Sequence, residues 1–150
     1  MFPTEYAAKT LVTSYILSRL DYCNCLLMGT PNFVIQLLQE IQNFAPRLVL
    51  LAPSHHHSVP LLEKPHWLPI SKRIKYKAAY MCFIAINGSG PAYLSELIHA
   101  YTPSRTLRSS RNFCRTFSCF GPHIRNSLPQ HLRHCSTLSS FKAKLKTFLF

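Results

Sequence analysis

The stretch Ser71–Asn87, SKRIKYKAAYMCFIAIN, gives the clearest indication of the fold of this chain. Its apolar residues recur every three or four positions, which is the period of an α-helix that buries one face. The stripe and the residues that widen it are Ile74, Ala78, Met81 and Ala85, with Tyr80, Phe83 and Ile84. Ser71 is suited to cap the start of this helix, and Asn87-Gly88 is suited to end it. We therefore expect one largely buried helix over this stretch.

Helical periods also fill most of the chain on either side. The predicted segments are Glu5–Leu20, a helix from Asn32 as N-cap to about Leu48, shorter pieces at Val59–Glu63, Pro91–His99, Pro122–Leu128 and Pro129–His134, and a last helix at Leu138–Phe150. No run of alternating apolar and polar residues is long enough to predict a strand. The sequence thus predicts a mostly α fold, an irregular array of about five helices.

The helix that begins at Asn32 contains a proline at position 46. A proline inside a helix removes a backbone donor and clashes with the preceding turn, at a cost of about 3 kcal/mol. We therefore expect a kink or a break near Phe44.

Composition divides the chain into three parts. Residues 1–52 and 71–150 are expected to be helical, and residues 53–70 form a linker rich in proline and histidine. The third part ends in a basic tail. Within it, Thr102–Arg115 is polar and basic without any period, which predicts an exposed loop.

Charge is the strongest bulk signal. The chain has 17 Lys and Arg against 5 Asp and Glu, a formal net charge of +12, and no acidic residue follows Glu96. A field of one sign favours an anionic partner such as nucleic acid, an acidic protein or an anionic membrane surface. The alternative is a solvated basic surface whose acidic neighbour belongs to a larger protein.

The same charge balance argues against catalysis. A polymerase or nuclease centre needs clustered carboxylates to hold two metal ions, but no two of the five acids here lie within fifteen residues of each other. The four glycines do not form a phosphate-binding loop, and no serine lies in a G-x-S-x-G turn. We therefore predict no catalytic residues, no cofactor and no enzyme activity.

Cysteine and histidine residues, which are the usual ligands of structural zinc, are concentrated near the C-terminus. They are Cys114, Cys119, His123, His131, His134 and Cys135. No CxxC or HxxxH pair is present, so we predict no metal site. The irregular spacing of the six cysteines favours reduced thiols, most of them small buried hydrophobes such as Cys82.

No segment predicts a membrane span, because the longest strongly apolar stretch, Ala78–Ile86, is far shorter than the roughly 20 residues required. The first residues lack the basic start and apolar block of a secretory signal. We therefore expect an intracellular protein of the nucleus or cytoplasm, not a secreted one.

Several short strings follow one another in a set order from about Leu11 to Phe150. They are SRLDYCN at 18–24, QN at 42–43, RLV at 47–49, HWLPI at 66–70, GPAYLSEL at 90–97, PSR at 103–105, LRSS at 107–110, NSLP at 126–129 and FKAKLKTFLF at 141–150. The series resembles the C-terminal region of the reverse transcriptase polyprotein of non-LTR retrotransposons, of the chicken-repeat and jockey-like kind. Each string alone is weak, whereas the ordered series is specific.

The resemblance implies a supporting role without catalysis. In that family the catalytic carboxylates lie in the palm, upstream of the matching region, and the endonuclease lies further upstream. The matching region resembles the thumb, here residues 1–52, and the helical extension after it. The resemblance therefore implies that the helical array is a fragment of a larger protein. The implied partners of this region are the RNA or DNA backbone, bound weakly and without sequence preference, and the polymerase domain itself.

Nine basic residues are the predicted phosphate contacts. They are Lys72, Arg73, Lys75, Lys77, Arg105, Arg108, Arg111, Lys142 and Lys146. At the start of the predicted helix, a bound anion would relieve the repulsion between basic side chains and the helix dipole, although these side chains are also able to splay into water. Trp67 and Tyr76 are candidates for base stacking, with core packing favoured for both.

A second hypothesis assigns no ligand to the chain. It is then a helical structural or protein-interaction fragment without autonomous function. Helices that pack on an absent domain expose apolar surface, so this hypothesis predicts self-association.

Overall fold

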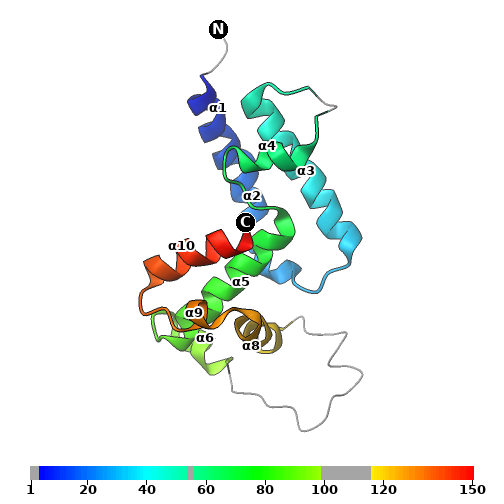
Figure 1. The fold of residues 1–150 in the computed structure, drawn as a ribbon. Helices are drawn as coiled ribbons and strands as arrows, with labels where there is room; N and C mark the ends of the chain where they lie inside the picture. The colour runs from blue at the N-terminus through cyan, green and yellow to red at the C-terminus, as the bar shows by residue number, and fades with distance from the viewer. Residues whose placement is uncertain (1–3, 54–55, 99–115) are drawn as a thin grey trace. The chain divides into compact units, whose positions relative to one another are not determined.

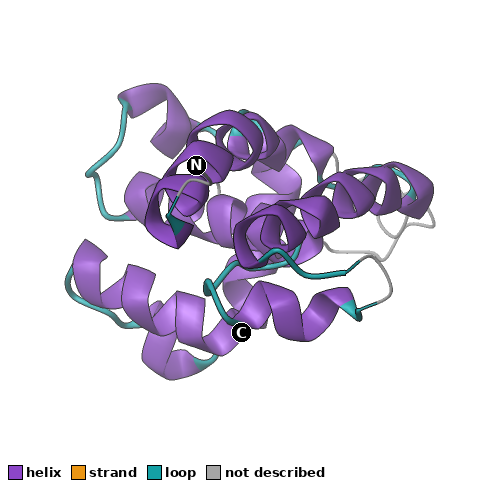
Figure 2. Cartoon of the chain, turned by 90° about the horizontal axis from the view of Figure 1, so that it is seen from above, coloured by secondary structure: helices purple, strands orange, loops and turns teal. Residues whose placement is uncertain are grey.

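The computed structural model describes residues 4–53, 56–98 and 116–150, and these residues form helices and loops (Figure 1). Within these ranges there is no strand, as Figure 2 also shows. The helices of eight or more residues are α1, Glu5–Val12; α3, Asn32–Leu50; α5, Ile70–Ile86; α8, Phe117–Ser127; and α10, Leu138–Leu149. The predicted fold class, a mostly α array with about five main helices, is confirmed.

The chain divides into two compact units. The first unit comprises Met1–Asn24 and Pro31–Arg73, and the second comprises Cys25–Thr30 and Ile74–Phe150. The division therefore falls inside α5, whereas the sequence placed a linker at residues 53–70.

The N-terminal helix of the first unit changes its winding part-way. α1 is followed directly by a π-helical turn at Thr13–Leu17 and by α2, Ser18–Asp21. Hydroxyl groups donate back to carbonyls one turn earlier, from Thr13 to Lys9 at 2.7 Å and from Ser14 to Thr10 at 2.8 Å. Such bonds compete with the regular helical ladder and accompany local changes of winding. The predicted helix at Glu5–Leu20 is thus one helical stretch with a π turn at its centre.

α3 continues through Pro46, so the chain does not break near Phe44, where the sequence predicted a kink or a break. Ala45 and Pro46 are fully buried in the unit, and their packing offsets the lost backbone hydrogen bond. The helix begins after Pro31 as N-cap, one residue earlier than expected. It ends at Leu51, whose φ of 49° places it in the left-handed region.

The segment predicted as a linker packs into the core of the first unit. It contains α4, Ser58–Glu63, which agrees to within one residue with the helical turn predicted at Val59–Glu63. The core residues come from α1, the π turn, α3, α4 and the loop after it: Val12, Leu17, Ala45, Val49, Leu62 and Trp67. Trp67 is thereby buried, which confirms the favoured prediction of core packing. Its ring is not available to stack on a base.

Two glutamines of α3 tie this loop to the first unit. Gln42 is fully buried, and its Nε2 donates to the carbonyl of Leu68 at 2.8 Å. Gln39 Oε1 accepts from the backbone N–H of Ile70 at 2.8 Å. The second bond satisfies a backbone donor at the start of α5, which no residue of that helix can do.

α5 starts one residue before the prediction, so Ser71 lies in its first turn and does not cap it. Its other end is as predicted from Asn87-Gly88. Gly88 has φ of 64°, and the N–H of Ser89 donates to the carbonyl of Ile84 at 3.0 Å, which is the pattern of a Schellman cap.

The second unit contains several helices besides α5. They are the 3-10 helix Asn24–Leu27, which begins in the first unit, then α6, Ala92–Glu96; α8; α9, Gln130–Arg133; and α10. α8 is longer than the predicted piece at Pro122–Leu128 and contains Pro122 in its interior. Pro91 precedes α6 as its N-cap and does not lie in its first turn. The predicted loop at Thr102–Arg115 lies outside the described residues.

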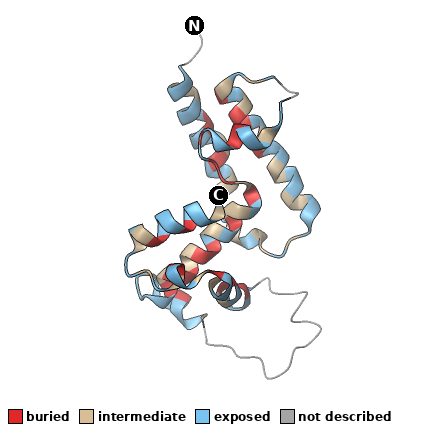
Figure 3. Ribbon diagram, viewed as in Figure 1, coloured by how far each residue is buried: buried red, intermediate tan, exposed pale blue. Residues whose placement is uncertain are grey.

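The core of the second unit, red in Figure 3, draws on α5, α8, α9 and α10. Its buried members are Ala78, Ala79, Phe83, Phe120, Ile124, Leu128, Leu132, Phe141 and Leu145. The rings of Phe83 and Phe141 stack with their centroids 4.2 Å apart, which fixes α10 against α5. In the portion of the chain that the structure describes, no helix has the length and hydropathy to cross a bilayer.

Candidate nucleic-acid interface

Positive charge is concentrated in the second unit. Its residue ranges hold eleven of the 17 Lys and Arg but only one acidic residue, Glu96. The ranges of the first unit hold six cations and four acids. The field of the second unit is therefore strongly positive, whereas the charges of the first nearly balance.

Two lysines of the second unit meet at one aromatic ring. Nζ of Lys142, on α10, lies 4.8 Å from the ring centroid of Tyr80, on α5. Nζ of Lys77, also on α5, lies 6.0 Å from the same centroid. Both distances are within the range of a cation–π contact, which holds the ammonium groups near the half-buried ring.

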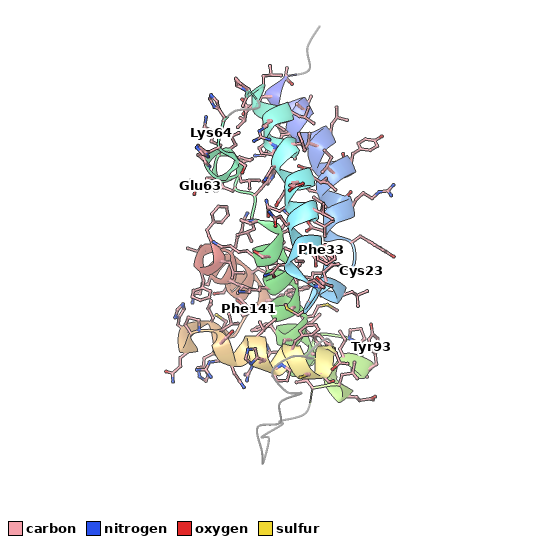
Figure 4. The ribbon with its side chains drawn as sticks, turned by 90° about the vertical axis from the view of Figure 1, so that its right-hand side faces the viewer. Cys23, Phe33, Glu63, Lys64, Tyr93 and Phe141 are labelled. Atoms are coloured by element: carbon pink, nitrogen blue, oxygen red, sulfur yellow. The ribbon has the colours of Figure 1, made fainter. Side chains whose placement is uncertain are left out.

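Core packing places Lys142 at this point. Phe141, labelled in Figure 4, and Leu145 are buried in the core of the second unit, and the stack on Phe83 orients α10. Lys142 follows Phe141 directly and therefore lies on the flank of α10 beside α5. Lys146 is exposed and lies one helical turn further on the same side. The lysines are thus positioned by apolar contacts, not by charge.

No carboxylate neutralises these lysines in the parts of the second unit that the structure describes. Lys75, Lys77, Lys142 and Lys146 are all exposed and form no ion pair there. Like charges that gather without a counter-charge raise the local potential, and a phosphate group would relieve it. Tyr76 lies one turn before Tyr80 and is half-buried against the core. Burial raises the pKa of its phenol, and the neighbouring Tyr80 raises it further.

Arg73 is engaged inside the first unit. Its Nε donates to Oδ1 of Asp21 at 2.7 Å, and its Nη2 contacts Oδ2. The guanidinium thereby uses two of its five N–H donors on a carboxylate. Lys72, the other predicted contact of this turn, is half-buried.

One of the free backbone donors that an anion would need at the start of α5 is already in use. The N–H of Ile70 donates to Oε1 of Gln39 at 2.8 Å. Lys75 and Lys77 therefore carry more of the candidate interface than Lys72 and Arg73 do.

The other predicted phosphate contacts, Arg105, Arg108 and Arg111, lie outside the described residues. So does Cys114 of the candidate zinc set. Among the described residues, no three His, Cys, Asp or Glu side chains lie close enough to hold a metal ion. All five acidic residues fall within those ranges.

The cysteines differ from the expectation of mostly buried thiols. Cys82 is buried, whereas Cys23 is exposed and Cys25 and Cys135 are intermediate. These four carry free thiols, as the sequence predicted. Cys119 is disulfide-bonded, so the expectation of reduced thiols is wrong for that residue. The Sγ of Cys25 contacts Met81 Sδ at 3.7 Å and so links the 3-10 helix to α5.

Sequence reasoning missed Tyr80 as part of the interface and assigned it only to the buried stripe. Its spacing of three from Lys77 places the two side chains on one side of a helix, which was a usable signal. The approach of Lys142 had no such signal, because that residue is distant in sequence.

No protein-family model, curated protein or solved structure matches this chain. The candidate interface therefore rests on the charges and contacts of its own residues.

Proposed function

We propose that the second unit is a non-catalytic module that binds the backbone of RNA or DNA without sequence preference. The observation that carries the proposal is the approach of Lys77 and Lys142 to the ring of Tyr80 with no carboxylate beside them. The surplus of positive charge in the same unit provides long-range attraction to a polyanion.

The arrangement favours phosphate over base recognition. Lysines offer point charges on flexible stems, which suit backbone contact, whereas base reading needs planar or bidentate groups. Lys142 and Lys146 are one turn apart, so a strand that follows α10 would meet them in succession. Tyr80 is half-buried and offers only part of its ring to a base. Affinity should therefore depend on salt more than on sequence.

The resemblance to the C-terminal region of non-LTR retrotransposon reverse transcriptases supports the same role. We extend the proposal to that origin: the chain corresponds to the thumb and the helical extension after the polymerase palm. In that setting the basic unit would hold template RNA, primer DNA or their hybrid, and the polymerase domain would be its natural neighbour.

A titration tests the proposal. The purified chain is added to fluorescently labelled single-stranded RNA of two unrelated sequences, at about 50 mM and about 200 mM salt. We expect binding to both RNAs with similar affinity, and at least a tenfold loss at the higher salt. Absence of binding at the lower salt, or strong preference for one sequence, would contradict the proposal.

A further inference from the structure

The outer face of α3 presents a continuous row of apolar side chains to solvent. Six residues of this row are each at least half exposed, with exposed fractions of 50–79%: Phe33, Leu37, Ile41, Phe44, Leu48 and Leu51. Figure 3 shows exposed turns along α3, and Figure 4 marks Phe33 among its side chains. Isolated exposed apolar residues are ordinary, but a row that follows a whole helix marks an interaction surface.

The spacing of the row is that of a coiled coil. From Leu37 to Leu48 the exposed apolar residues are separated by four, three and four positions, which places them at alternating d and a positions of a heptad. Leu51 follows as the C-cap of the helix. The opposite face of the helix, with Gln42, Pro46 and Val49, is buried in the first unit. One face of α3 therefore packs inside its own unit. The second face has the spacing of a coiled coil and has no partner in the described part of the chain.

We propose that this face pairs with the same face of a second copy of the chain, with the two α3 helices antiparallel about a two-fold axis. About a two-fold axis the same surface of each copy forms both sides of the interface, so the α3 face needs no other partner surface. Ile41 of each copy then meets Phe44 of the other, and Leu37 meets Leu48.

Charge at the edge of the row selects the antiparallel direction. Glu40 and Arg47 occupy successive g positions, and in an antiparallel pair each g position faces a g position of the other helix. The register that pairs Ile41 with Phe44 also places Glu40 opposite Arg47, twice in the dimer. In a parallel pair each g position faces an e position, and the e positions of this helix are Leu38 and Ala45, so neither charge finds a partner.

Arg47 is suited to accept such a partner. Its Nη2 donates to the carbonyl of His56 at 3.1 Å, and it forms no ion pair with the described residues. Its guanidinium lies 5.9 Å from the ring of Phe44, within the apolar row itself. A carboxylate from a second copy would approach a cation that the ring already holds in place.

The area agrees with a stable pair. Aromatic side chains carry about 150–250 Å² each and Leu and Ile carry less, so the six side chains at these exposures present at most about 700 Å² per copy. A symmetric pair would bury at most about 1,400 Å², within the range of about 1,200–2,000 Å² that specific interfaces bury.

Analytical ultracentrifugation of the full chain over a wide concentration range tests the proposal. We expect a reversible monomer–dimer equilibrium that Ile41→Glu or Leu48→Glu shifts to monomer, because each puts two charges into the apolar row. Leu11→Glu is the matched control, since Leu11 is similarly exposed but lies on α1, and it should leave the dimer intact. Circular dichroism must show unchanged helix content in each variant.

A charge exchange tests the direction. Glu40→Arg places like charges opposite each other and should weaken the dimer about tenfold, and the double variant with Arg47→Glu should restore it. A monomer at every concentration, a dimer indifferent to Ile41→Glu, or open-ended association without a defined mass would overturn the proposal. RNA binding by a monomeric variant remains expected, because it depends on the second unit.

Discussion

Arg73 and Asp21 form a two-point ion pair in the first unit although 52 residues separate them in sequence. The side chain of Arg73 is 15% exposed and that of Asp21 is 44% exposed, so solvent screens the pair in part. The pair links the end of α2 to the first turn of α5.

We predict that Asp21→Asn and Arg73→Met each lower the free energy of unfolding by about 1 kcal/mol, and that the double variant loses less than the sum. Urea unfolding followed by circular dichroism provides the double-mutant cycle. Arg19→Met is the control, because Arg19 is exposed on the same helix as Asp21. Strict additivity of the two changes would show that the pair does not stabilise the unit.

Gln42 should be essential to the first unit despite being polar. Gln42→Leu keeps the volume but leaves the buried carbonyl of Leu68 without its donor, so we expect a loss of about 1–3 kcal/mol. Gln36→Leu, at an exposed position of α3, should change stability by less than about 0.5 kcal/mol. Equal effects of the two substitutions in urea unfolding would contradict the role of this hydrogen bond.

The stack of Phe141 on Phe83 should dominate the stability of α10. Phe141→Ala removes a ring that is only 2% exposed, and such truncations destabilise by about 3–5 kcal/mol. Phe148→Ala removes a ring from the same helix that is 49% exposed and should cost about 1 kcal/mol or less. Thermal unfolding distinguishes the two, and similar melting temperatures for both variants would be inconsistent with the packing described above.

Stability should fall at alkaline pH because of Cys82. Burial raises the pKa of this thiol from 9.0 to about 11, and the nearby Arg125 lowers it only in part. The folded state thus favours the neutral thiol. This contribution is fully present below the unfolded pKa of about 9 and is lost as the pH rises through about 11.

Cys82→Ala should therefore unfold with a weaker dependence on pH between 9 and 11 than the parent chain. Urea unfolding at several pH values in that window measures the difference. Cys23→Ala serves as the control, because Cys23 is exposed. A parent chain and a Cys82→Ala variant with parallel pH profiles would show that the thiol does not titrate as described.

Local features of the sequence were enough to predict the helices but not their arrangement. The period of Ser71–Asn87 and the glycine after it located α5 to within one residue at each end, because both signals act over a few positions. Pro46 predicted a break in α3 that the structure does not show. The cost of a proline inside a helix is a local effect, whereas the burial of Pro46 that offsets this cost comes from packing across the unit.

The candidate interface was likewise predictable only in part: its charged residues could be named from the sequence, but their contacts could not. Lys77 and Lys142 were predicted as phosphate contacts from charge alone, and that assignment stays a prediction. Their approach to Tyr80 depends on the stack between Phe83 and Phe141, a contact between distant segments that no periodicity encodes. The pairing of Asp21 with Arg73 was missed for the same reason.

The salt dependence of RNA affinity in two charge-matched variants tests the central claim most directly. Lys77→Ala with Lys142→Ala removes two charges beside Tyr80, and Lys9→Ala with Lys64→Ala removes two exposed charges from the first unit. Each phosphate contact contributes about 0.7 to the log–log slope for single strands, so the first variant should lose about 1.4 units of slope. The second should keep the parent slope. Equal slopes for the two variants would contradict a phosphate-binding site at Tyr80.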